Sequence, residues 1–140
     1  MTIQAVRKVL TVLWIGNLWT IGYIVVPTLF HVLEDRAQAG MIAGHLFSIA
    51  SYLGLVCGGI LLGLAITQSG RRFSWRAGLL IALLLIILGG EFLVRPMLAD
   101  LKVQGLSSGA EFARLHAVSA TLYLINSLLG LVWVVFARGD

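Results

Sequence analysis

Charged residues are scarce in this chain of 140 residues: Asp, Glu, Lys and Arg make up only 11% of it, against ~25% in an ordinary soluble domain. Hydrophobic residues make up 59%, and this composition excludes a soluble enzyme. The single cysteine excludes a secreted disulfide scaffold. Two prolines and 16 glycines are too few for a fibrous or disordered chain.

Sequence motifs of common enzymes are also missing. The chain contains no G-x-S-x-G, phosphate-binding loop, C-x-x-C or H-E-x-x-H. The net charge is +4, but the ten Lys and Arg residues are scattered between apolar runs and form no basic face. Nucleic acid is therefore excluded as a partner, and the sequence assigns no catalytic residue.

Long apolar runs are what the chain does have. A transmembrane helix needs roughly 20 mostly apolar residues, and every backbone amide in lipid must be paired within its own segment. We therefore predict an all-α membrane protein, a bundle of four transmembrane helices in one domain over residues 1–140, in contact with the lipid bilayer. No linker or repeat is evident. The predicted spans are residues 9–30, 42–66, 77–94 and 116–137.

The distribution of Lys and Arg predicts the orientation, because basic residues are enriched in cytoplasmic loops. Six basic residues are expected on one side and four on the other, so both termini are predicted to be cytoplasmic, in a bacterial inner membrane. The first group comprises Arg7, Lys8, Arg71, Arg72, Arg76 and Arg138, and the second comprises Arg36, Arg95, Lys102 and Arg114.

Helix contacts are indicated by glycine and asparagine. The second span carries three G-x-x-x-G spacings, which allow close backbone approach and mark it as the central packing helix. Asn17 and Asn126 lie well inside their spans and are expected to hydrogen-bond across helices. The glycine pairs are Gly40/Gly44, Gly54/Gly58 and Gly59/Gly63.

Ionisable residues converge on the predicted outer end of the bundle. His31 ends the first span, His45 lies in the second, Glu91 lies near the end of the third, and His116 begins the fourth. Ionisable groups inside a membrane are costly and usually face the bundle interior, so each is a functional hypothesis by default. These four residues are the predicted metal ligands.

Several chemistries fit this set. Imidazoles with a carboxylate suit zinc, copper or iron(II), and two histidines could ligate a haem iron with Arg95 or Arg114 pairing a propionate. The predicted cofactor-binding residues are His116, His45, His31, Arg95 and Arg114. A chain of His and Glu could instead relay protons or conduct a cation. The structural alternative is that Glu91 pairs with Arg95, one turn further along the helix.

Short motifs carry a resemblance to a family. They are residues 26–30 (V-P-T-L-F) after Gly22, residues 44–47 (G-H-L-F), residues 95–96 (R-P) and residues 112–119 (F-A-R-L-H-A-V-S). At these positions the chain resembles the small four-span membrane proteins grouped with eukaryotic transmembrane protein 205, whose bacterial members form a domain-of-unknown-function family. The resemblance implies a four-span bundle and supplies no activity.

A looser resemblance is to the small four-span haem-associated protoporphyrinogen oxidases. It rests on size and on the P-x-L-F element of residues 27–30. This chain departs from that family because it has no histidine early in the first span.

Three functions are therefore carried forward. The first is binding of a transition metal or haem at the outer end, for metal handling or redox chemistry. The second is a non-catalytic membrane subunit or assembly factor with a structural ion-pair network. The third is a small oligomeric transporter of cations or drugs. The expected partners are a second copy of the chain or another membrane protein.

Overall fold

The computed structural model describes residues 2–68 and 74–136. These ranges contain four helical segments long and apolar enough to cross a membrane, which confirms the predicted fold class. Arg71, Arg72 and Arg138, on which the predicted orientation partly depends, lie outside the described residues. The segments are Ile3–Val32, Arg36–Gln68, Trp75–Val103 and Ala110–Phe136.

The first and third segments are each built from three helical pieces. The first comprises the α-helix α1 (Ile3–Thr20), the π-helix η1 (Ile21–Val25) and α2 (Val26–Val32). The third comprises α4 (Trp75–Gly89), the π-helix η2 (Gly90–Val94) and α5 (Arg95–Val103). The second and fourth segments are the single α-helices α3 (Arg36–Gln68) and α6 (Ala110–Phe136).

Proline explains why these two segments change their winding. Proline has no N–H to donate, and its ring collides with a carbonyl of the preceding turn of an α-helix. Pro27 and Pro96 each follow two residues after the end of a π-helix. The wider turns let both helices continue through the proline, so the third segment reaches Val103, well beyond the predicted end at residue 94.

Side-chain caps set the helix starts. Asp35 Oδ1 accepts hydrogen bonds from the backbone N–H groups of Ala37 at 2.8 Å and Gln38 at 3.3 Å, where α3 begins. Ser74 Oγ accepts from Ala77 N at 3.2 Å, at the start of α4. These bonds satisfy backbone donors that have no partner inside the helix.

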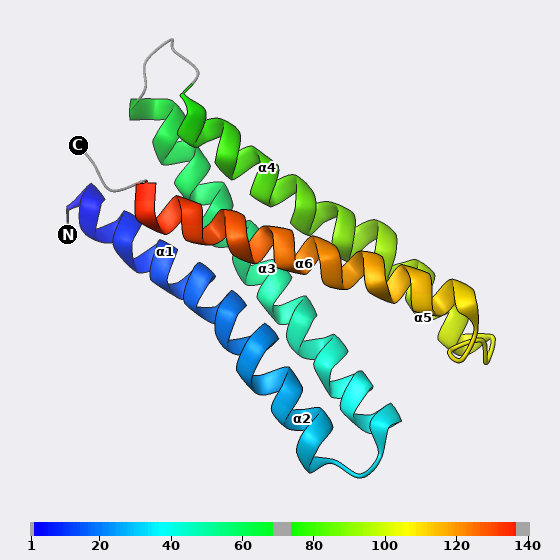
Figure 1. Ribbon diagram of the computed structural model, residues 1–140. Coiled ribbons are helices and arrows are strands. Elements are labelled where there is room, and N and C mark those ends of the chain that lie inside the picture. Colours follow the sequence, from blue (N-terminus) through cyan, green and yellow to red (C-terminus); the bar gives the residue numbers. More distant parts are fainter. Residues whose placement is uncertain (1, 69–73, 137–140) are drawn as a thin grey trace.

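The chain forms two helical hairpins. α1, η1 and α2 pack against α3, and α4, η2 and α5 lie beside α6 (Figure 1). The hairpins contact each other through α3 with α4 and α1 with α6. Their tips, the α2–α3 and α5–α6 connections, point in different directions (Figure 1). We call the end of the bundle that carries these tips the distal end.

The core lies in the other half of the bundle. Trp14 is 1% exposed, and its ring packs on Gly54 and Gly58 of α3. A Cβ at Gly54 would lie 2.7 Å from Trp14 Nε1, whereas a Cβ at Gly59 or Gly63 would meet nothing within 4 Å. Close approach along α3 is thus confirmed for the Gly54/Gly58 pair and not for Gly59/Gly63.

Candidate functional site

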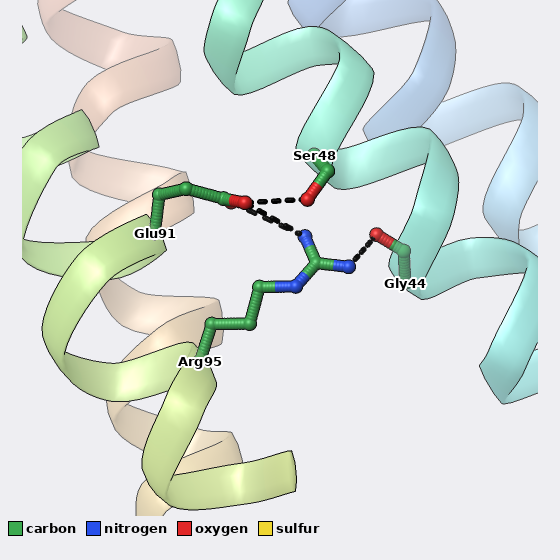
Figure 2. A network of polar contacts seen from close by, with 4 residues as sticks. All are labelled: Gly44, Ser48, Glu91 and Arg95. Atoms are coloured by element: carbon green, nitrogen blue, oxygen red, sulfur yellow. Dashed lines mark hydrogen bonds and ion pairs between the residues drawn. The ribbon is translucent and has the colours of Figure 1, made fainter.

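Glu91 lies in η2 with its side chain 8% exposed. Its carboxylate is paired with side chains of the same chain. Arg95, one turn further on, places Nη1 3.2 Å from Glu91 Oε2 in an ion pair (Figure 2). The Arg95 side chain is 31% exposed. A carboxylate inside a membrane is costly unless it is paired. The ion pair confirms the structural alternative, in which Glu91 pairs with Arg95.

The second span completes the network. Ser48 Oγ donates a hydrogen bond to Glu91 Oε1, and Arg95 Nη2 donates to the carbonyl oxygen of Gly44 (Figure 2). Glycine keeps this approach open, because a Cβ at Gly44 would lie 3.3 Å from Arg95 Nη2. Glu91 and Arg95 belong to the second hairpin, and Gly44 and Ser48 to the first. The network therefore connects the two hairpins.

The three histidines take no part in the contacts of this network. His31, His45 and His116 are all exposed. The imidazole of His116 stacks on the ring of Phe112, with centroids 6.2 Å apart and planes inclined by 10°. Lys102 Nζ lies 5.9 Å from the Phe112 centroid. His116 thus belongs to a surface stack on α6.

The predicted metal ligands are not brought together. Over residues 2–68 and 74–136, which include all four of them, no group of three or more His, Cys, Asp or Glu side chains is placed to hold a metal ion. A haem held between helices needs two histidines that face the bundle interior, whereas all three histidines are exposed. Arg114, the second predicted propionate partner, is exposed on α6. Within the described residues the structure thus gathers no such ligand set, and metal or haem binding stays a prediction.

A second polar contact joins the first and fourth spans. The Tyr123 ring lies against Gly22 in η1, where a Cβ would overlap it, and the hydroxyl donates to the carbonyl oxygen of Leu18. Phe47 packs edge-on against the same ring, with centroids 5.0 Å apart. Sequence reasoning missed this contact, because no local spacing relates Gly22 to Tyr123.

Hydrogen bonds deeper in the bundle only partly match the prediction. Trp133 Nε1 donates to Thr11 Oγ1 at 3.2 Å and joins α6 to α1. The expected bonds across helices from asparagine are not seen for two buried atoms, Asn17 Nδ2 and Asn126 Oδ1, which have no hydrogen-bond partner among the residues that the structure describes. The neighbouring Ser127 is fully buried and donates to the carbonyl oxygen of Tyr123 in its own helix at 2.7 Å.

Comparison with known proteins gives a family match. A family model described as "Domain of unknown function (DUF4149)" matches residues 9–107. This range includes Gly44, Ser48, Glu91 and Arg95, and it ends before α6. The search of curated proteins and the search of solved structures each found no match. A bacterial domain-of-unknown-function family is thereby supported, while the likeness to transmembrane protein 205 stays a prediction.

Proposed function

The chain belongs to the DUF4149 family, whose function is unknown, and we propose that it is a membrane subunit or assembly factor whose Glu91–Arg95 network is a structural lock between two hairpins. Its place is a bacterial inner membrane with both termini in the cytoplasm. Its partner is another membrane protein or further copies of itself. This is the second of the three functions considered from the sequence.

The observation that carries the proposal is that both oxygens of the Glu91 carboxylate are used within the chain. Oε1 accepts from Ser48, and Oε2 lies 3.2 Å from Arg95 Nη1. A metal ion at Glu91 would have to displace these partners. It would leave the Arg95 guanidinium without its counter-charge in a partly buried position, and that is unfavourable.

Packing also supports a structural role over transport through a single chain. The half of the bundle opposite the distal end is filled by Trp14, Leu61, Leu80 and Leu83, each at most 1% exposed. A solute path along the bundle axis would have to displace these side chains. Close-packed interiors resist such rearrangement.

Two variants test the lock. Glu91→Gln and Arg95→Gln each leave one partner of the pair without its counter-charge, so each should lower the free energy of unfolding. Because Arg95 is partly exposed, we expect about 1–3 kcal/mol, less than for a fully buried pair. The measurement is the midpoint of thermal aggregation in detergent. The matched control is Glu34→Gln, which removes an exposed carboxylate outside the helices and should leave the midpoint unchanged. Equal midpoints for all four proteins would refute the lock.

The proposed role as a membrane subunit is tested separately, with protein extracted from native membranes. After mild solubilisation, native mass spectrometry of the wild type should give a mass above that of one chain. A chain that is monomeric under every mild condition, with the lock intact, would contradict the subunit role alone.

A further inference from the structure

The two hairpins are copies of one pattern. Ile21–Val25 and Gly90–Val94 are both π-helices, and each is followed by proline at the same position. The next span of each hairpin then carries H-x-x-S-x-x-x-Y-L, beginning at His45 in α3 and at His116 in α6. This shared pattern indicates a parallel internal repeat of the kind found in some membrane proteins.

Side-chain contacts obey the same relationship. Tyr23 of η1 faces Tyr123 of α6 with ring centroids 6.1 Å apart. The equivalent residues, Phe92 of η2 and Tyr52 of α3, face each other at 6.4 Å. The bundle therefore has two equivalent seams between hairpins, one between η1 and α6 and the other between η2 and α3.

The seams differ in what fills them. In the first, Gly22 leaves room for the Tyr123 ring, and the hydroxyl is used on the Leu18 carbonyl. In the second, Glu91 takes the position equivalent to Gly22, and Tyr52, the equivalent of Tyr123, is 53% exposed. The first seam is filled by an uncharged aromatic contact, whereas the second is filled by the ion pair of Glu91 with Arg95.

The cation in the second seam is the Arg95 guanidinium, which donates to oxygen atoms of both hairpins. Arg95 donates to Oε2 of the Glu91 carboxylate from Nη1 and to the Gly44 carbonyl from Nη2, while Ser48 Oγ donates to Oε1 of the carboxylate. A planar guanidinium offers donors in a fixed fork that suits such acceptors. We call Glu91, Ser48 and Gly44 the oxygen cage.

Arg95 reaches the cage on a flexible side chain that is 31% exposed, so its guanidinium is the replaceable part of the network. π-helices are frequent at functional sites. Interrupted helices in matching positions of two repeats are a pointer to the substrate site of repeat-built membrane proteins. The same seam holds the ring pair of Tyr52 and Phe92, with centroids 6.4 Å apart, and aromatic rings attract cations.

We infer that the oxygen cage is a binding site for a small organic cation carrying a guanidinium group, and that Arg95 occupies it as an internal ligand. The inference rests on the network used in the proposed function and adds a ligand to it. A tethered Arg95 competes at high effective concentration, so the external cation binds best when this side chain moves out or is removed.

The test uses Arg95→Ala with methylguanidinium chloride as the probe. Methylguanidinium should raise the thermal midpoint of this variant along a saturable curve in the millimolar range. It should give no such rise in the wild type, in which the cage is filled. The matched control is the double variant Glu91→Gln/Arg95→Ala, which lacks the carboxylate and should not respond. Sodium chloride at equal ionic strength should have no effect on either variant.

Absence of a saturable rise in Arg95→Ala, or an equal rise in the double variant, overturns the inference. If Arg95→Ala fails to accumulate, the readout becomes recovery of monodisperse protein when membranes are extracted with methylguanidinium present, and no recovery overturns it equally. The two proposals fail separately. If Arg95→Ala is destabilised but methylguanidinium does not raise its midpoint, the structural lock is supported and the binding site is refuted. If Arg95→Ala is as stable as the wild type and methylguanidinium raises its midpoint, the lock is refuted and the binding site is supported.

Discussion

Gly22 and Tyr123 are complementary across the first and fourth spans. The ring occupies the space that any side chain at Gly22 would need, and the hydroxyl reaches the Leu18 carbonyl one turn earlier in the first span. A single glycine thus allows a large aromatic residue to close one seam of the bundle.

Gly22→Ala should therefore be destabilising. The added methyl group would displace the Tyr123 ring and break its hydrogen bond, at a cost of about 1–3 kcal/mol for overpacking. The measurement is the thermal midpoint in detergent. The matched control is Gly59→Ala, because a Cβ there meets nothing within 4 Å, and alanine is favoured over glycine in a helix by up to about 1 kcal/mol. If Gly22→Ala is as stable as Gly59→Ala, the position of the Tyr123 ring does not depend on the absence of a side chain at Gly22.

The sequence predicted the spans because length and hydropathy are local properties. It also indicated the Glu91–Arg95 pair as the structural alternative to a metal site, since the partners are one turn apart on one helix. Ser48 and Gly44 could not be predicted as partners, because the packing of α3 against η2 decides their contact.

The internal repeat escaped sequence reasoning for a different reason. The shared residues are few and widely spaced, and apolar positions between them are interchangeable in lipid. Only the two π-helices and the equivalent ring pairs made the pattern evident. The exposure of the three histidines could not be predicted, because a residue's depth in the membrane does not fix which side of its helix faces the bundle interior.

Exchanging the charges of the network should not restore it. In the double variant Glu91→Arg/Arg95→Glu, the ion pair remains available, but a carboxylate would face the Gly44 carbonyl, and two acceptors cannot share a hydrogen bond. We expect the thermal midpoint to stay as low as that of Glu91→Gln, corresponding to about 2 kcal/mol of lost stability. Recovery of the wild-type midpoint would show that opposite charge alone suffices and that the contacts to the second span are dispensable.

Metal content separates the lock from the first function considered. Protein purified without a histidine tag should contain iron, copper and zinc far below one equivalent by elemental analysis, since His31, His45 and His116 are exposed and not gathered. His116→Ala should give the same result as the wild type. Near-stoichiometric metal that disappears in His116→Ala would instead establish a metal site and refute the structural assignment of the polar end.

The orientation of the chain can be tested with single cysteines. The natural Cys57 is buried, so Cys57→Ala provides the background. Gln4→Cys and Ser107→Cys then place one thiol at each end of the bundle, and both positions are exposed. Because Arg7 and Lys8 follow Gln4 and basic residues are retained on the cytoplasmic side, an impermeant maleimide applied to intact spheroplasts should label Ser107→Cys and not Gln4→Cys. After lysis both should react. Labelling of Gln4→Cys in intact spheroplasts would reverse the orientation and move the oxygen cage to the cytoplasmic side, where its cation would have to come from inside the cell.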